Sequence, residues 1–319
     1  MTQKTIIITG GNSGLGYQTA KNIAIAKPEW TIVIASRNNE RMSQAVERLK
    51  AETNNRNIYG IRIDVSSLQS VREFVNHFKN AELPPLYGIV ANAGAQFTEE
   101  VITEDGFEGT FATNYLGHFL LIQLLLPLIA DNGRIIMVSS DTHDPAVKTM
   151  MPAPVYTDPS ILADQKMSYE MLRKYSAFKR SGIRYTTSKL AIIYFVHELS
   201  RKLIEAGRND IVVDSFNPGL MVGNGSNLAR DYNPVVKYMW NHMAFIIPHL
   251  HYFDKHTIRS VTISGRDLAE LMLTSSNAVQ SGQYWDGDRM IPSSPESYNR
   301  DREARLWQWS LKVTNLREW

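Results

Sequence analysis

Short apolar runs of strand length alternate with longer segments of helical spacing along most of the chain. The runs are rich in β-branched residues and lie at residues 5–9, 31–35, 58–63, 88–91, 135–138 and 211–216. Apolar residues recur with helical spacing over residues 17–25, 42–51 and 71–78. Strands that are apolar on both faces and alternate with helices indicate a parallel sheet covered on both sides. We therefore predict an α/β fold, a doubly wound parallel sheet.

The chain of 319 residues shows no repeat or linker-like run, so we predict a single domain over residues 1–319. Two stretches interrupt the alternation. Residues 141–184 are rich in Met, Tyr and Pro, and residues 223–264 mix Tyr, Trp, Met and His with charges. Both are too long for plain connections. We expect an insertion at 141–184 and a helical lid at 223–264, whose Met and aromatic side chains either line an apolar substrate pocket or bury the insertion's own core.

Charge and composition exclude several classes of protein. The chain has 34 Lys and Arg against 32 Asp and Glu, a net charge of +2, so no nucleic-acid partner is expected. It has no cysteine, which removes disulfides and thiolate chemistry. No metal is expected either, because the histidines lack metal-site spacing; they are His242, His249, His251 and His256. The longest apolar stretch, residues 116–130, is too short for a membrane span, so we expect no integral membrane segment and a cytoplasmic protein.

A glycine-rich turn after the first apolar run predicts a dinucleotide site of the Rossmann type. Gly10, Gly14 and Gly16 form the pattern GxxxGxG immediately before a helical segment. Missing side chains let the backbone approach a pyrophosphate, and a helix N-terminus favours its negative charge. The expected contacts are Gly10, Asn12, Ser13, Gly14, Leu15 and Gly16.

The end of the second run favours NADP(H) over NAD(H). Where an acidic residue would bind the ribose 2'-hydroxyl of NAD, the chain has Ser36 and Arg37. A guanidinium binds the 2'-phosphate that a carboxylate would repel. Asp64, after the third run, either lies against the adenine or caps the next helix. The other cofactor contacts expected at strand ends are Val65, Asn92, Ala93 and Gly94.

Tyr185 and Lys189 are separated by four positions in a segment with helical spacing, so their side chains lie on one helix face. A phenol has an ordinary pKa of about 10 and exchanges protons poorly near neutral pH. A nearby ammonium favours the phenolate and lowers that pKa. The pair therefore predicts a tyrosine that acts as a general acid or base.

Five motifs follow one another in a fixed order: the glycine turn, the sequence NAG at 92–94, Asn114, the sequence VSS at 138–140, and the YxxxK pair. In this order the chain resembles the short-chain dehydrogenase/reductase superfamily over about residues 4–218. The resemblance implies that Tyr185 is the proton donor or acceptor. It implies that Lys189 holds the nicotinamide ribose and lowers the tyrosine pKa.

The same resemblance implies roles for other positions. Ser140, rather than Ser139, would orient the substrate carbonyl, and Asn114 would anchor a water that links the lysine to solvent. Pro218 and Gly219 would pass close to the nicotinamide.

Within the superfamily, the sequence NYLGHFLL at 114–121 resembles retinol dehydrogenases and light-dependent protochlorophyllide reductases, and it makes His118 a packed helix residue rather than a ligand. The gap from Ser140 to Tyr185 is longer than the family's common one, which indicates an insertion beside the site. Ala191 and Leu220 occupy positions where the protochlorophyllide enzymes have cysteine, which weakens a photochemical assignment.

We therefore expect an NADP(H)-dependent oxidoreductase that transfers hydride between the nicotinamide and a bulky apolar carbonyl or alcohol. One alternative is reduction of an activated C=C bond, as in a protochlorophyllide-like reaction. Another is a non-catalytic NADP(H)-binding regulator, although such proteins often lose one of the four catalytic-type residues that this chain retains. The expected partner is a small apolar substrate, and the apolar helix after Tyr185 leaves a homo-oligomer open.

Overall fold

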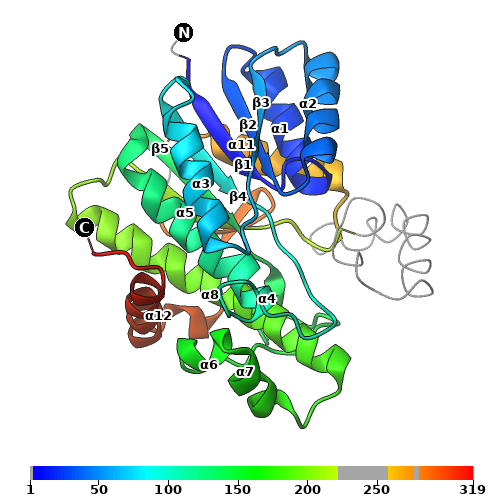
Figure 1. Ribbon diagram of the computed structural model, residues 1–319, viewed down its shortest axis with the longest axis vertical. Coiled ribbons are helices and arrows are strands. Elements are labelled where there is room, and N and C mark those ends of the chain that lie inside the picture. The colour runs from blue at the N-terminus through cyan, green and yellow to red at the C-terminus, as the bar shows by residue number, and fades with distance from the viewer. Residues whose placement is uncertain (1–2, 222–257, 276–279, 319) are drawn as a thin grey trace.

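The computed structural model describes residues 3–221, 258–275 and 280–318. In these ranges a single sheet of eight strands forms the centre of the molecule (Figure 1). The strands are β1 (Thr5–Thr9), β2 (Thr31–Ser36), β3 (Ile58–Arg62), β4 (Leu86–Ala91), β5 (Ile129–Val138), β6 (Val212–Asn217), β7 (Tyr284–Asp286) and β8 (Arg289–Ile291). Their order is β3-β2-β1-β4-β5-β6-β7-β8, and every pairing is parallel except β7 with β8.

Helices cover both faces of the sheet, so the predicted doubly wound α/β fold is confirmed. One face carries α1, α2 and α11, and the other carries α3, α5 and α8. The helices are α1 (Gly14–Ala26), α2 (Asn39–Thr53), α3 (Leu68–Lys79), α4 (Gly109–Phe111), α5 (Gly117–Leu125), α6 (Pro159–Ala163), α7 (Gln165–Leu172), α8 (Ala177–Glu205), α11 (Val261–Leu273) and α12 (Arg300–Val313).

Each predicted apolar run coincides with a strand, because β-branched side chains pack well on a surface that is buried on both sides. All residues of β1, β2, β4 and β6 are buried. In the edge strand β3 Ile58 and Ile61 are buried and the other residues are exposed, since one side of the strand lacks a neighbouring strand. The sequence did not predict β7 and β8, which have three residues each and too little apolar sequence to show a period.

Polar side chains fix where several helices begin. Asn38, Ser67, Ser176, Ser260 and Asn299 each accept a hydrogen bond from a backbone N–H in the first turn of the helix that follows. Such caps satisfy donors that have no partner inside the helix.

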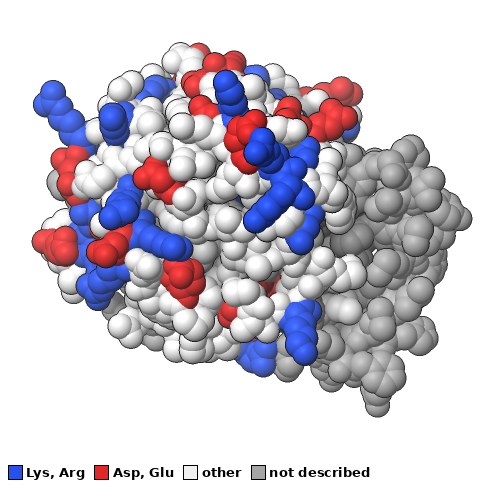
Figure 2. Space-filling model, turned by 90° about the horizontal axis from the view of Figure 1, so that it is seen from below, with Lys and Arg blue, Asp and Glu red and all other residues white. Residues whose placement is uncertain are grey.

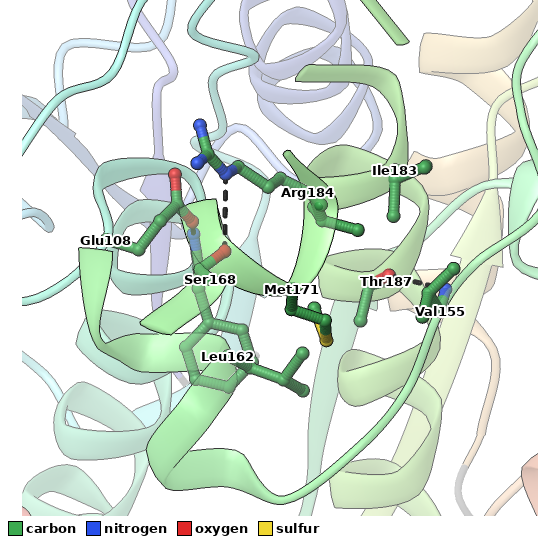
Figure 3. Close-up of a pocket in the computed structure, with 10 residues that line it drawn as sticks. Glu108, Val155, Leu162, Ser168, Met171, Ile183, Arg184 and Thr187 are labelled. Carbon is green, nitrogen blue, oxygen red and sulfur yellow. Dashed lines mark hydrogen bonds between the residues drawn. The ribbon is translucent and has the colours of Figure 1, made fainter. Parts of the chain in front are cut away.

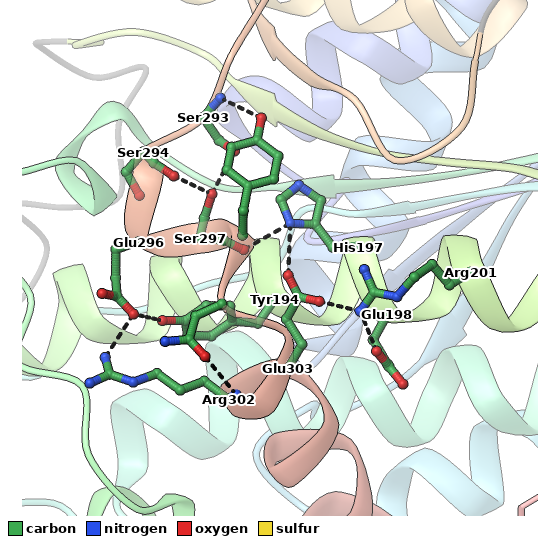
Figure 4. Close-up of polar contacts among 12 residues, drawn as sticks. Tyr194, His197, Glu198, Arg201, Ser293, Ser294, Glu296, Ser297, Arg302 and Glu303 are labelled. Atoms are coloured by element: carbon green, nitrogen blue, oxygen red, sulfur yellow. Dashed lines mark hydrogen bonds and ion pairs between the residues drawn. The ribbon is translucent and has the colours of Figure 1, made fainter.

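Helix α8 is fastened along its outer side to the C-terminal segment (Figure 4). Tyr194 donates a hydrogen bond of 2.7 Å to Glu296, and the Nδ1 of His197 lies 2.9 Å from the Ser297 carbonyl oxygen. The indole of Trp307 stacks on Phe195 at 5.8 Å between ring centres. Polar and aromatic contacts therefore hold α8 against the sheet from outside.

Two sequence predictions need correction. Helix α8 begins at Ala177, so Tyr185 lies about two turns inside it and residues 177–184 of the predicted insertion belong to this helix. Residues 261–264 belong to α11, which packs on α1, so a lid could not extend to residue 264. Residues 223–257 of the predicted lid, with its four histidines, lie outside the described residues.

The Met and aromatic residues of the insertion divide between core and surface. Tyr156 and Met171 pack against the main core. Met150, Met167 and Phe178 are exposed, with 78%, 52% and 60% of their surface accessible. Part of the set therefore packs on the main core of the protein rather than on a separate core of the insertion.

Gly109–Leu128 is the stretch of the described chain that is apolar and long enough to cross a membrane, and 83% of it is buried inside the protein. Its α5 part packs on the same face of the sheet as α3 and α8, as a core helix does. The cytoplasmic location remains a prediction. Charged side chains of both signs are interspersed on the face shown in Figure 2.

Candidate active site

The glycine turn forms a cradle from which side chains are excluded. Gly10 and Gly14 adopt φ values of +67° and +56°, a conformation that side chains rarely allow. A Cβ on Gly16 would lie 2.7 Å from the Asn92 amide nitrogen and 2.8 Å from the Gly10 carbonyl oxygen. Helix α1 begins at this turn, so its N-terminal N–H groups face the same space. Asn12 and Ser13 are partly exposed beside it, and Leu15 is buried beneath it.

The end of β4 supports this turn directly. The side-chain amide of Asn92 donates to the Thr9 carbonyl oxygen at 2.8 Å. The backbone N–H groups of Asn92 and Ala93 both donate to Thr9 Oγ1 at 2.9 Å. The Asn92 side chain thus holds the glycine turn in shape. Gly94 lies close to the next site residue, because a Cβ on it would lie 3.1 Å from Asn114 Oδ1.

The ends of β2 and β3 bring Arg37 and Asp64 together. A guanidinium nitrogen of Arg37 lies 3.7 Å from Asp64 Oδ2, and 62% of the arginine side chain is exposed. The other oxygen of Asp64 accepts hydrogen bonds from the Ser66 N–H at 3.0 Å and its hydroxyl at 2.6 Å. Ser67 rather than Asp64 caps α3.

One further feature of this edge fits a polar ligand group, whereas Val65 belongs to the packing around it. The hydroxyl of Ser36 is buried and has no hydrogen-bond partner among the described residues. The loop at Val65 is tightly packed, because a Cβ on Gly117 would lie 1.8 Å from its carbonyl oxygen. Together with the side-chain-free turn, an unsatisfied hydroxyl and an exposed guanidinium match the polar groups of a phosphorylated dinucleotide.

Helix α8 presents Tyr185 and Lys189 on one face. The ammonium nitrogen of Lys189 lies 5.4 Å from the centre of the Tyr185 ring and donates a hydrogen bond of 2.9 Å to the Val138 carbonyl oxygen. Burial lowers the pKa of Lys189 to about 8, because the charged form loses solvation. A positive charge at this distance favours the phenolate form of the tyrosine.

The two serines after β5 have different partners. Ser139 is buried, and its hydroxyl donates to the Lys189 carbonyl oxygen at 2.9 Å, so it binds β5 to α8. Ser140 is partly exposed, and its hydroxyl donates to Asp141 at 3.1 Å and accepts from the Thr142 N–H at 3.3 Å. Ser140 is therefore the one of the pair that can turn toward a ligand.

Asn114 lies in one turn of π-helix, η1 (Ala112–Leu116), just before α5. Its side-chain oxygen accepts from the Ala95 N–H at 2.7 Å, while its amide nitrogen donates to the Ala95 carbonyl oxygen at 3.0 Å and to Ser188 Oγ at 2.9 Å. The side chain is fully engaged with protein groups. Its backbone carbonyl oxygen lies 3.3 Å from His118 Nδ1 and has a second lone pair with which it can bind a water, and π-turns often occur at functional sites.

A buried network that the sequence did not reveal holds Pro218 and Gly219. Ser264 donates to the Pro218 carbonyl oxygen at 2.6 Å, and Asn217 Oδ1 accepts from the Gly219 N–H at 3.1 Å. Arg259 donates to the Asn217 carbonyl oxygen at 3.2 Å and to Asp286 at 2.8 Å. These partners lie far apart in sequence and belong to no local motif, so no pattern could have indicated them.

A small cavity of about 10 Å³ lies on the side of α8 opposite Tyr185 (Figure 3). Ile183 and Thr187 line it, and on a helix they point nearly opposite to Tyr185. Glu108, at its edge, caps α4 by accepting from two backbone N–H groups. The cavity therefore belongs to the packing of the insertion. Among the described residues no cluster of His, Asp and Glu could hold a metal.

Comparisons with known proteins agree with this geometry. A family model described as short chain dehydrogenase matches residues 4–156. Polyprenol dehydrogenase of Homo sapiens is 33% identical over 319 residues, which cover 98% of this chain and 86% of the relative. Retinol dehydrogenase 13 of Mus musculus is 30% identical over 317 residues, covering 98% and 84%.

Another relative is longer than this chain. WW domain-containing oxidoreductase of Gallus gallus is 34% identical over 70% of this chain, and the match spans only 50% of the relative. Among solved structures, an uncharacterised protein from Mycobacterium paratuberculosis aligns with a TM-score of 0.68 and 24% identity, covering 99% of this chain and 94% of that one. This likeness shows the fold.

Proposed function

This chain is an oxidoreductase of the short-chain dehydrogenase family, and we propose that it uses NADP(H) to interconvert a bulky apolar carbonyl compound and its alcohol. The observation that carries the proposal is the buried ammonium of Lys189, 5.4 Å from the centre of the Tyr185 ring and on the same helix face. An ammonium in that position stabilises the phenolate, which helps a phenol that must lose and regain a proton during the reaction.

The bound nicotinamide would supply or accept the hydride. In the reducing direction the proton leaves Tyr185 Oη for the substrate oxygen, and the Lys189 ammonium stabilises the phenolate that remains. The hydroxyl of Ser140, at the edge of the site, orients the substrate oxygen with a hydrogen bond. A water on the Asn114 carbonyl returns a proton toward the lysine from solvent.

The residues that would hold the dinucleotide lie along the carboxyl ends of the parallel strands, where doubly wound folds bind ligands. Gly10, Gly14 and Gly16 leave room for the pyrophosphate, and the N-terminus of α1 favours its charge. The exposed Arg37 would bind the 2'-phosphate of NADP(H), with Asp64 keeping the guanidinium at the strand end.

The substrate class rests on the relatives and on the sequence. Polyprenol and retinol are both apolar alcohols, and proteins named for their dehydrogenation match 98% of this chain. A bulky apolar alcohol or carbonyl compound is therefore the first substrate to test. Reduction of an activated C=C bond and a non-catalytic, NADP(H)-binding role are the alternatives.

The decisive experiment replaces Tyr185 with phenylalanine. Tyr185→Phe should keep NADPH binding, measured by quenching of protein fluorescence, and should lose about 10²- to 10⁴-fold in turnover because the acid is gone. The matched control is Tyr169→Phe, a partly buried tyrosine on α7. Wild-type turnover in Tyr185→Phe would contradict the proposal.

The assay should follow NADPH oxidation against apolar aldehydes, ketones and enones, in darkness and in light. Turnover of aldehydes or ketones in darkness supports the proposed reaction. Turnover of enones alone, or turnover that needs light, favours C=C reduction. NADPH binding with no turnover of any class favours the regulator.

A further inference from the structure

We propose that His118 is a positioning residue that fixes the backbone carbonyl of Asn114 for the proton relay and connects it to the glycine turn through Thr9. The inference rests on the proposed function, because it assigns the Asn114 carbonyl a part in proton transfer. It goes beyond that function by naming what holds the carbonyl in place.

Both ring nitrogens of His118 have partners. The imidazole lies on the first turn of α5 and is 1% exposed. Its Nδ1 lies 3.3 Å from the Asn114 carbonyl oxygen, and its Nε2 lies 2.9 Å from Thr9 Oγ1. A carbonyl oxygen can only accept, so Nδ1 carries the proton and Nε2 is the acceptor. The hydroxyl of Thr9 then donates its proton to Nε2 at 2.9 Å, in preference to the Val90 carbonyl oxygen at 3.5 Å.

The neutral form of the ring is required for this arrangement, since a protonated imidazole has no acceptor. Burial, opposed by the hydrogen bond to the Asn114 carbonyl and helped by the charge of Lys189, lowers the pKa of His118 to about 4. At neutral pH the ring is therefore a single neutral tautomer. A ring held in one tautomer fixes the position of the Asn114 carbonyl but does not exchange protons itself.

Thr9 completes the connection. Its hydroxyl oxygen accepts from the backbone N–H groups of Asn92 and Ala93 while its proton goes to His118. Thr9 is also the last residue of β1 and directly precedes the first glycine of the cofactor turn. The imidazole thus links the π-turn of Asn114 to Thr9 at the end of β1, and Thr9 in turn holds the end of β4.

A residue that merely fills space does not explain these contacts. Neighbouring positions on α5, such as Phe119 and Leu120, are apolar and fully buried in the same core. A buried imidazole costs free energy unless both nitrogens are satisfied. Both nitrogens of His118 are satisfied, and both of its partners, Thr9 and Asn114, belong to segments beside the candidate active site.

The test compares two substitutions of His118. His118→Asn places an amide nitrogen near the position of Nδ1 and keeps the donor to the Asn114 carbonyl, whereas His118→Leu removes both hydrogen bonds and keeps the volume apolar. We expect His118→Leu to lose about 10- to 100-fold in kcat, with KM and the Kd for NADPH within about threefold of wild type. We expect His118→Asn to retain most of the activity.

Two readouts separate positioning from mere stability. In His118→Leu the solvent deuterium isotope effect on kcat should increase, because the proton relay becomes slower than the other steps. The matched control is Phe119→Leu, on the same helix but packed against Phe195 and Trp307. It should lose thermal stability without changing the isotope effect.

The inference is overturned if His118→Asn and His118→Leu lose activity equally, or if His118→Leu matches Phe119→Leu in kcat and isotope effect. It can also be tested without turnover. Imidazole ¹⁵N chemical shifts of the wild-type protein should show a neutral ring protonated at Nδ1 at pH 7, and any other form would refute it. An inactive wild type would count against the proposed function, whereas an active enzyme indifferent to His118 would count against this inference alone.

Discussion

Replacing Lys189 with methionine should make the protein more stable while abolishing turnover. The side chain of Lys189 is buried, and its pKa falls from 10.5 to about 8 on burial. At about 1.4 kcal/mol for each pH unit, keeping this ammonium charged in the native state costs about 3 kcal/mol. Methionine removes that cost but also removes the donor to Val138, whose loss costs about 1 kcal/mol.

The net expectation for Lys189→Met is a gain of about 2 kcal/mol in the free energy of unfolding at pH 7, or about 4 °C in Tm. Turnover should fall by about 10²- to 10⁴-fold, because the phenolate of Tyr185 loses its counter-charge. Chemical denaturation gives the first quantity, and NADPH oxidation gives the second.

The pH dependence gives the sharper test. Between pH 8 and 10.5 the unfolded state binds more protons at this lysine than the native state, so the stability of the wild type rises with pH in this window. The advantage of Lys189→Met should therefore be largest below pH 8 and vanish at about pH 10. Above about pH 10.5 the variant should be about 1 kcal/mol less stable than the wild type, because only the lost hydrogen bond to Val138 remains. Lys166→Met, at an exposed lysine on α7, is the matched control and should show no such trend. A destabilised Lys189→Met at pH 7, or a difference that does not change with pH, would refute the reasoning.

Two substitutions probe the cofactor site. Arg37→Asp should weaken NADPH binding about 100-fold and NADH binding far less, since a carboxylate repels the 2'-phosphate. Equilibrium titration measures both affinities, and Arg56→Asp, at an exposed position before β3, is the control. An unchanged ratio of the NADPH and NADH affinities would remove Arg37 from the phosphate site. Gly16→Ala should raise the Kd for NADPH by at least about tenfold, because the added Cβ would displace Asn92 or the glycine turn that Asn92 holds. Gly207→Ala is the control: at φ +71° and with open space around it, it should lower stability without changing the Kd. Equal NADPH affinities in the two variants would contradict the role of the glycine turn in binding the cofactor.

Local patterns predicted the parts of the fold that local physics determines. Strands β1 to β6 and the first three long helices follow from apolar periodicity, and the glycine turn follows from backbone geometry at Gly10 and Gly14. The pairing of Tyr185 with Lys189 follows from helical spacing.

Other features depend on partners far away in the sequence. The start of α8 at Ala177 is a different case, because it depends on a local cap, Ser176, that lies before the continuous apolar stretch near Tyr185. Thr9 and His118 are hydrogen-bond partners although they lie 109 positions apart in the sequence, so sequence analysis identified the histidine only as a packed helix residue. Sequence periodicity carries no information on such pairs.

The connection after β6 leaves and re-enters the described fold at neighbouring positions. Leu220 forms a parallel bridge with Ile258, and the next residue, Arg259, is anchored to Asn217 and Asp286. The strand order between β6 and β7 is therefore set on both sides of this connection by contacts among described residues.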